Sequence, residues 1–253
     1  MKKIIVLVVV MLALVGCKSQ PATSFLDELV DKNQIIMATS PDYPPFESKD
    51  TNNQIVGFDI EMMEEVMRIL NSNNNTDLKL VLEPMDFELI LTAINMKQAD
   101  VGVSAFTYDK DRQVGFSETY VVSRQVVIVA ANSDIKTIAD LDGKKIAVGM
   151  GTTGESAIED QIPTAVIDNT GDYPLRFEAL EQGLVDAVVC DEAVGDNYVA
   201  NRGFVKLATA LIDEEMKAIV HSDHSLLLVE LNKAIAEFIA TDKYFELKEK
   251  WGV

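Results

Sequence analysis

Short apolar runs rich in β-branched residues alternate with segments of helical periodicity along most of this 253-residue chain. Examples are "QIIMATS" followed by "DIEMMEEVMRIL", "LKLVLEP" followed by "FELILTAINM", and "PLRFEALEQG" followed by "DAVVCD". Such alternation is typical of an α/β fold with largely parallel sheets. The first helical segment predicts a core-facing stripe of Ile60, Met63, Val66, Met67 and Leu70. The stretch "NSNNNTD", residues 71–77, is expected to be a polar loop after that helix.

An internal repeat indicates that the fold contains two similar units. "AINMKQADVGVSA" can be laid on "ALEQGLVDAVVCD", which matches Asp100 with Asp186. The alternative is chance likeness between two helix-turn-strand segments. If the repeat is real, Ser104–Ala105 and Cys190–Asp191 end equivalent strands of two lobes. Ligands bind beyond the carboxyl ends of strands in open α/β sheets, so a cleft with one wall from each lobe is expected.

The N-terminus predicts an export signal over residues 1–17. Two lysines precede an unbroken apolar run, Ile4 to Val15, that is too short to span a bilayer core comfortably. A buried first helix is the alternative, although no polar stripe interrupts the run. "LVGC" also resembles the lipobox of bacterial lipoproteins, which implies that Cys17 is lipidated and that residues 18–24 form a tether. The protein is then exported and lipid-anchored at the membrane, in the periplasm or on the cell surface.

The charge and cysteine content exclude several functional classes. The formal net charge is −19, and removal of the two signal lysines leaves −21. This acidity argues against binding to nucleic acid and against electrostatic docking on anionic lipid. With Cys17 assigned to lipid, Cys190 has no partner for a disulfide, and its apolar surroundings predict a small core residue.

Two short motifs raise other possibilities. "VGMGTTGE" places Gly149, Gly151 and Gly154 at G-x-G-x-x-G spacing, with Asp168 about twenty residues on, as in a dinucleotide fingerprint. An exported protein has little access to a dinucleotide, so we expect the turn to aim its amides at another anion, and we expect no cofactor. The pair in "HSDH" is predicted to lie in a turn without the further ligands that a metal requires.

A resemblance to a known family becomes specific over nearly the whole chain. Seven segments resemble, in order, the motifs of family 3 extracytoplasmic solute-binding proteins. They are "SPDYPPFES", "GFDIEMMEEV", "PMDFELILTAI", "TYDKDRQVGFSETY", "DLDGKKIAVGMGTTGES", "ALEQGLVDAVVCDE" and "KWG". The resemblance implies a type II periplasmic-binding-protein fold, with two lobes and two parallel or mixed sheets joined by two hinge strands. It places residues 25–120 and 217–253 in lobe 1, residues 125–212 in lobe 2, and hinges near 121–124 and 213–216. It also implies a monomer that delivers a free amino acid to an ABC permease with a cytoplasmic ATPase.

The resemblance assigns one group of residues to the ligand's carboxylate. Arg112 stands where the family has its carboxylate-binding arginine, and a planar guanidinium suits that bidentate task. The alternative for Arg112 is an ordinary surface charge within "DKDR". Thr107 matches a threonine that meets the same carboxylate, and Thr152 and Thr153 match the carboxylate-binding turn of the second lobe. The amide and hydroxyl of Thr153 are the expected donors.

Two further positions are implied for the ligand's ammonium group. Asp191 matches the family acid that pairs with the ammonium, and the backbone carbonyl of Ala105 is expected beside it. The alternative for Asp191 is an N-cap for the helix that follows.

Four residues are assigned to the ligand's side chain. Tyr43 and Phe87 match two aromatic positions that clamp it, although core packing is the alternative for Phe87. Ser40 and Ser104 are expected nearby, and Ser40 departs from relatives that carry an acid there for basic ligands. Aromatic faces can still hold a cation. Lysine or arginine is therefore the first expectation, followed by glutamine and other polar amino acids.

Two other functions are compatible with this scaffold. One is an enzyme of the small-acid dehydratase type, for which Glu155 and Glu192 are the nearest candidate acids. The other is a sensory lipoprotein that no longer takes part in transport. No histidine precedes position 221, and no G-x-S-x-G elbow is present, so Ser-His or Cys-His catalysis is not expected.

Overall fold

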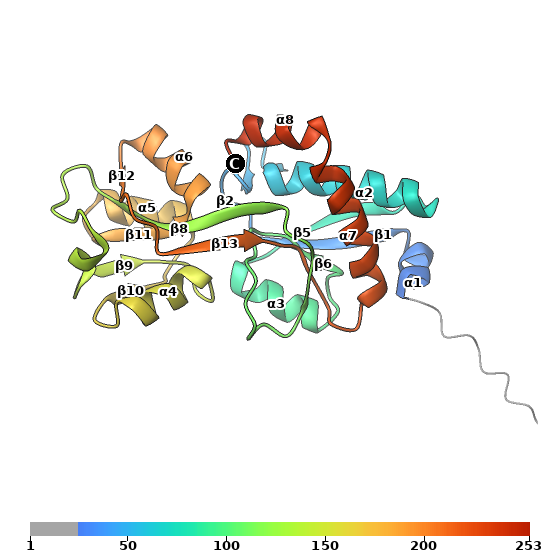
Figure 1. Ribbon diagram of the computed structural model, residues 1–253, viewed down its shortest axis with the longest axis horizontal. Helices are drawn as coiled ribbons and strands as arrows, with labels where there is room; N and C mark the ends of the chain where they lie inside the picture. The colour runs from blue at the N-terminus through green and yellow to red at the C-terminus, as the bar shows by residue number, and fades with distance from the viewer. Residues whose placement is uncertain (1–24) are drawn as a thin grey trace, which may run out of the picture.

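The computed structural model describes residues 25–253, which form a two-lobed α/β protein (Figure 1). The expected signal, its cysteine and the tether lie outside the described residues. Within residues 25–253, no helix has the length and apolar character needed to cross a membrane.

The first lobe is built on a mixed five-stranded sheet. Its order is β5 (Lys79–Pro84), β1 (Gln34–Thr39), β6 (Val101–Gly102), β14 (Ile219–Val220) and β7 (Gly115–Phe116). Strands β5 and β6 run parallel to β1, whereas β14 is antiparallel to both of its neighbours. The sheet is therefore less parallel than expected, because β14 returns from the second lobe rather than following a helical crossover.

Helices cover both faces of this sheet. One face carries α3 (Phe87–Asn95), and the other carries α2 (Phe58–Asn74) and α7 (Ser225–Ile239), with α1 (Phe25–Lys32) and α8 (Asp242–Trp251) packed beside them. The predicted stripe on α2 is confirmed, because all five of its apolar residues are buried. The expected loop after α2 was placed too early. The helix continues to Asn74, and Asn75 ends it in the left-handed conformation at φ 52°.

The second lobe contains a sheet with one parallel half and one antiparallel half. Its order is β10 (Val166–Asp168), β9 (Lys145–Ala147), β11 (Ala187–Asp191), β8 (Val121–Val129) and β12 (Val205–Lys206), with β13 (Ile212–Met216) also paired to β8. The short 3₁₀ helix η1 (Ile138–Leu141) precedes β9. Helix α4 (Thr153–Gln161) packs on one face, and α5 (Tyr173–Glu181) and α6 (Glu192–Arg202) pack on the other. Cys190 is fully buried in this core, as predicted.

Two paired strands run from one lobe to the other. Strand β8 pairs with β13 antiparallel, from Val121 opposite Met216 to Gln125 opposite Ile212. In Figure 1 this ribbon extends from the second lobe into the first.

The internal repeat has a physical counterpart in the two sheets. Asp100 accepts a hydrogen bond from the amide of Ile36 at 2.8 Å and donates its own amide to the Ile36 carbonyl at 2.9 Å. Asp186 makes the same two bonds with Lys145, at 2.8 and 2.7 Å. Each aspartate therefore fixes the start of a buried strand, β6 or β11, beside its neighbour.

Candidate functional site

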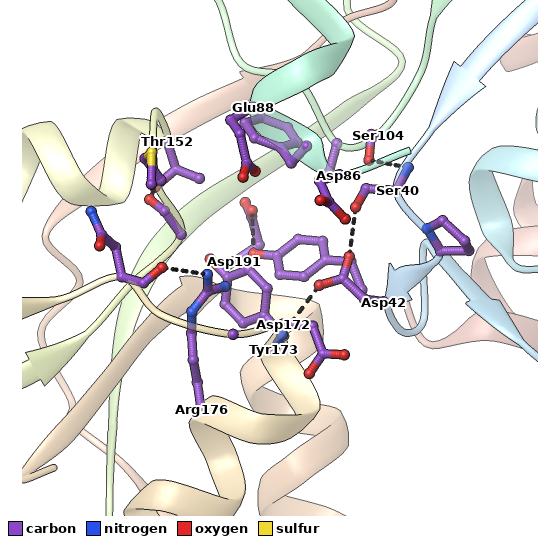
Figure 2. A pocket seen from close by; sticks show the side chains of 18 of the residues that line it. Ser40, Asp42, Asp86, Glu88, Ser104, Thr152, Asp172, Tyr173, Arg176 and Asp191 are labelled. Carbon is purple, nitrogen blue, oxygen red and sulfur yellow. Dashed lines mark hydrogen bonds between the residues drawn. The ribbon is translucent and has the colours of Figure 1, made fainter. Parts of the chain in front are cut away.

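All ten predicted ligand residues line one cavity between the lobes. Its volume is about 840 Å³, within the range of small-molecule sites. Figure 2 shows polar side chains from both lobes directed into this space. The predicted residues that line it are Ser40, Tyr43, Phe87, Ser104, Ala105, Thr107, Arg112, Thr152, Thr153 and Asp191.

Arg112 lines the cavity from the first lobe and reaches the second. Its Nη1 donates to the Thr107 carbonyl at 3.0 Å, and its Nη2 donates to the Gly151 carbonyl of the second lobe at 2.8 Å. The guanidinium also lies 5.2 Å from the ring centroid of Phe106 and 5.9 Å from that of Phe87. Burial lowers the pKa of Arg112, while Asp109 and Glu214 oppose this shift. Arg112 is thus a half-buried cation oriented into the site, not a freely solvated charge.

The turn that contains Gly149 and Gly151 leads directly into α4, and the two threonines that follow it have different roles. Thr152 is the N-cap: its hydroxyl donates to the Gly149 carbonyl at 2.8 Å and accepts from the Glu155 amide at 3.2 Å. With its one proton used, the Thr152 hydroxyl cannot donate to a ligand. The Thr153 hydroxyl donates to Glu214. The Thr153 amide belongs to the first helical turn, where amides have no acceptor within the helix.

Asp191 is buried at the end of β11, where it meets Tyr43 from the other lobe. The Tyr43 hydroxyl donates to Asp191 Oδ2 at 2.8 Å and accepts from the Asp191 amide at 2.8 Å. Although Asp191 occupies the N-cap position of α6, its side chain makes no capping hydrogen bond. Burial, followed by the nearby carboxylate of Glu214, raises the pKa of Asp191 well above its ordinary value. A cation at this point would stabilise the ionised form.

Ser40 brings an unexpected carboxylate into the cavity. Its hydroxyl donates to Asp42 Oδ1 at 2.8 Å, and Asp42 Oδ2 accepts from the Tyr173 amide of the second lobe at 3.1 Å (Figure 2). Asp42 therefore places a carboxylate beside Ser40, the position at which some relatives carry an acidic residue. Burial raises the pKa of Asp42, and its hydrogen bonds together with Arg176 oppose the shift.

The two predicted aromatic clamps are both partly engaged in packing. The ring of Tyr43, in the short strand β2 (Asp42–Tyr43), lies 4.4 Å from that of Tyr173, and the residue is only 8% exposed. Phe87 stacks on Phe106 at 4.5 Å and remains half-buried at the cavity wall. Core packing and cavity lining therefore coexist at Phe87.

Sequence reasoning missed several residues that face the same space. Asp42, Asp172, Tyr173 and Arg176 line the cavity, and the Arg176 guanidinium lies 4.6 Å from the centre of the Tyr173 ring. Asp42 lies inside the quoted "SPDYPPF" motif and was detectable by its position beside Ser40. No sequence pattern pointed to the residues of α5, because whether they face the cavity depends on how the two lobes pack together.

The acids considered for enzymatic chemistry are not cavity-lining residues. Glu155 Oε2 accepts from the Gly151 amide at 2.7 Å and its Oε1 accepts from Asn169 at 3.0 Å, so it supports the turn from behind. Glu192 pairs with Arg124 and Lys206, each at 2.7 Å. Both carboxylates are therefore committed to contacts elsewhere in the protein.

The two weaker motifs have structural roles. Asp168 pairs with Lys145 at 2.7 Å and accepts from Thr170, and these bonds lower its pKa to about 2. The "HSDH" segment lies in a turn, and the described residues contain no cluster of potential metal ligands.

Known proteins resemble this chain over nearly all of the described residues. Residues 35–253 match the model of the bacterial extracellular solute-binding proteins, family 3. The chain is 28% identical to the ABC transporter arginine-binding protein 1 of Escherichia coli, covering 86% of this chain and 90% of that protein. It is 29% identical to the arginine-binding extracellular protein ArtP of Bacillus subtilis, covering 87% and 86%.

A solved structure agrees with these sequence relatives. An ancestral arginine-binding protein bound to arginine superposes with a TM-score of 0.80 at 31% identity, covering 87% of this chain and 98% of that one. Both the two-lobed fold and the sequence motifs are thus shared with amino-acid-binding proteins. The chain belongs to the bacterial extracellular solute-binding proteins of family 3.

Proposed function

We propose that this protein captures a basic or polar L-amino acid by lobe closure and delivers it to an ABC permease driven by a cytoplasmic ATPase. Lysine and arginine are the favoured ligands, followed by glutamine and other polar amino acids. The observation that carries the proposal is the cavity of about 840 Å³ in which a cation of one lobe and a buried carboxylate of the other face the same space. A free amino acid carries the two complementary charges.

The backbone of the ligand is held by groups from both lobes in this proposal. Arg112 binds the carboxylate through its guanidinium, with support from Thr107 and from the amide of Thr153. Asp191 binds the ammonium, and the carbonyl of Ala105 accepts a second hydrogen bond from it. Of the predicted carboxylate ligands, Thr152 uses its hydroxyl to cap α4 and does not donate that hydroxyl to the ligand.

The charges that line the cavity favour a cationic ligand side chain. Five carboxylates and three cations line it: Asp42, Asp86, Glu88, Asp172 and Asp191, with Lys49, Arg112 and Arg176. Assigning Arg112 and Asp191 to the ligand backbone leaves four carboxylates facing two cations. Tyr43 and Phe87 border the same space, where aromatic faces add about 0.5–2 kcal/mol of attraction for a cation. The arginine-binding descriptions of two relatives and one structural neighbour agree with this choice.

Lobe closure uses the ribbon of β8 and β13 as its hinge. We assign residues 121–124 and 213–216 to the hinges, residues 25–120 and 217–253 to lobe 1, and residues 125–212 to lobe 2. The Tyr43–Asp191 and Arg112–Gly151 hydrogen bonds cross between the lobes, so closure and ligand binding involve the same groups. We further propose that the protein acts as a monomer, exported and anchored to the membrane through lipid on Cys17.

Calorimetric titration of the mature protein with each of the twenty amino acids tests the proposal. Lysine or arginine should bind most tightly, and Asp42→Asn should weaken their binding more than that of glutamine. A folded sample that binds none of the twenty would refute the amino-acid function. Preferential binding of aspartate or glutamate would refute the charge argument.

A further inference from the structure

Two carboxyl groups are buried side by side directly behind the cavity wall. Glu47 opens strand β3 (Glu47–Lys49) and Asp59 lies in the first turn of α2, and both side chains are fully buried. The start of α2 is fastened to the β2–β3 connection by the Asp59 amide, which donates to the Phe46 carbonyl at 3.0 Å. Gly57 permits this approach, because a Cβ there would lie 2.0 Å from the Phe46 oxygen. The fold thus forces the two acids together.

Each acid holds one residue of the turn that lines the ligand cavity. Glu47 Oε1 accepts from the Ser104 hydroxyl at 2.7 Å, and Asp59 Oδ2 accepts from the Ala105 amide at 2.9 Å. Ala105 has a φ of 48°, a left-handed conformation that non-glycine residues adopt only when their surroundings impose it. Asp59 is the group that binds the amide of this strained residue. The backbone conformation of Ala105, which lines the cavity, therefore depends on the acid pair.

The second oxygen of each carboxyl lacks a fixed donor. Glu47 Oε2 and Asp59 Oδ1 are buried with no hydrogen-bond donor in the protein when both groups are ionised. Among the described residues, neither carboxyl forms a salt bridge, and the titratable groups that act on the pair are Asp42, Tyr120 and the two acids themselves. Tyr120 donates to Asp59 Oδ2 at 3.1 Å. A single proton placed between the two free oxygens would satisfy both.

Electrostatics supports one shared proton. Two adjacent carboxylates in a desolvated site cannot both ionise at ordinary pH. Burial, and then the charge of Asp59, raises the pKa of Glu47 well above its ordinary value. Asp59 accepts hydrogen bonds from Ala105 and Tyr120 that favour its ionised form, whereas the one donor to the Glu47 carboxyl within residues 25–253 is Ser104. The proton therefore belongs on Glu47.

We propose that Glu47 and Asp59 share one proton, carried by Glu47, and that this pair acts as a positioning device for the Ser104–Ala105 turn beneath the ligand. The protonated Glu47 carboxyl donates to Asp59, and the ionised Asp59 holds the Ala105 amide. The part that concerns the ligand rests on the proposed function, because it assumes that the Ala105 carbonyl meets the ligand's ammonium. The shared proton does not depend on that assumption.

Infrared spectroscopy of the ligand-free mature protein tests the proton directly. At pH 8 the wild type should show the carbonyl stretching band of a buried protonated carboxylic acid, identified by its shift on ¹³C labelling of glutamate. The band should be absent from Glu47→Gln. It should persist in the control variant Glu64→Gln, because Glu64 is exposed on α2, the helix that contains Asp59. Absence of the band from the wild type would overturn the proposal, whether or not any amino acid binds.

The two neutralising substitutions should have unequal effects. Glutamine at position 47 reproduces the donor of the protonated carboxyl, whereas asparagine at position 59 replaces an ionised acceptor by a neutral one. Asp59→Asn should therefore weaken ligand binding roughly tenfold, and Glu47→Gln should change it by less than about threefold. Equal effects of the two variants would contradict the placement of the proton on Glu47.

The pH dependence of unfolding provides a separate readout. The folded-state pKa of Glu47 lies above its unfolded value, so the unfolded chain releases a proton that the native state keeps. Each pH unit above the ordinary range of glutamate should then lower the folded-to-unfolded ratio roughly tenfold, up to the folded-state pKa. Glu47→Gln should reduce the slope by the contribution of one proton, and Glu64→Gln should leave it unchanged. A slope unchanged in Glu47→Gln would overturn the proposal.

Discussion

Substitution of Arg112 by alanine separates ligand binding from folding. The side chain reaches the cavity with its guanidinium held between the Thr107 carbonyl at 3.0 Å and the Gly151 carbonyl at 2.8 Å. In the proposed complex the same guanidinium also donates two hydrogen bonds to the ligand's carboxylate. Each hydrogen bond to a charged group is worth about 1.5–3 kcal/mol. Loss of both should therefore cost roughly 3–6 kcal/mol of binding free energy, or about 10²–10⁴ in Kd.

The unliganded protein should lose much less stability. Arg112 is only half-buried, so solvent weakens its two hydrogen bonds to protein carbonyls, and one of these bonds exists only while the lobes meet. Thermal unfolding of Arg112→Ala without ligand should thus correspond to a loss of about 1–2 kcal/mol. If the residue were only a structural element, the stability loss would be the larger effect and the Kd would change little.

Isothermal titration calorimetry with arginine and lysine provides the assay. Arg112→Lys keeps the charge but cannot form the planar two-point contact, so its Kd should fall between those of the wild type and the alanine variant. Arg68→Ala is the matched control, since that arginine is exposed on α2 and pairs only with Glu65 along the helix. A Kd for Arg112→Ala within about threefold of the wild type would refute the assignment of Arg112 to the ligand.

Three further outcomes follow from the same structure. Gly57→Ala should destabilise the protein by at least about 3 kcal/mol in thermal unfolding, because φ is 148° and the new Cβ would meet Phe46, whereas Gly143→Ala, with open space around it, should cost only about 1–2 kcal/mol. Glu192 has a pKa lowered to about 2 by its two cationic partners, so the stability it contributes is present above its ordinary pKa and is lost as the pH falls toward 2; Glu192→Gln should flatten the acid limb of a stability–pH curve. Cys17→Ala should release the protein from membranes in cell fractionation, and continued sedimentation with the membrane in high salt would contradict the lipid anchor.

Features set by local pattern could be predicted from the sequence. The buried stripe of α2 follows from helical spacing. The equivalence of Asp100 and Asp186 follows from the internal repeat, and each of these aspartates accepts a hydrogen bond from the backbone amide of a neighbouring strand. The candidate site residues were assigned because the motifs that contain them resemble those of the family, and local spacing alone would not have identified them. Helix α2 extends further than expected because Asn75, not the preceding asparagines, adopts the left-handed conformation that ends it.

The allocation of hydrogen bonds could not be predicted in the same way. Ser104 donates its proton to Glu47, which lies 57 residues away, and Asp42 meets the Tyr173 amide across 131 residues. These partners are determined by how β2, β3, the turn after β6 and the start of α5 come together, and no local spacing encodes that arrangement. The antiparallel course of β14 has the same origin, since the chain reaches this strand directly from β13 and not through a helix.

The contacts between the lobes explain why a charged ligand should drive closure. Asp191 is bound by the neutral hydroxyl of Tyr43, and Arg112 by the neutral carbonyl of Gly151. A ligand's ammonium and carboxylate would give these two groups partners of opposite charge, and the ammonium would favour the ionised form of Asp191 against the effect of burial. Because the two ions belong to opposite lobes, only the closed form can offer both partners to one ligand, and this difference in affinity shifts the equilibrium toward closure. An N-acetylated arginine, which lacks the ammonium, should therefore bind at least about tenfold more weakly than arginine and should not reduce the radius of gyration in small-angle scattering. Full compaction by the acetylated compound would show that closure does not depend on the pairing of Asp191 with a cation.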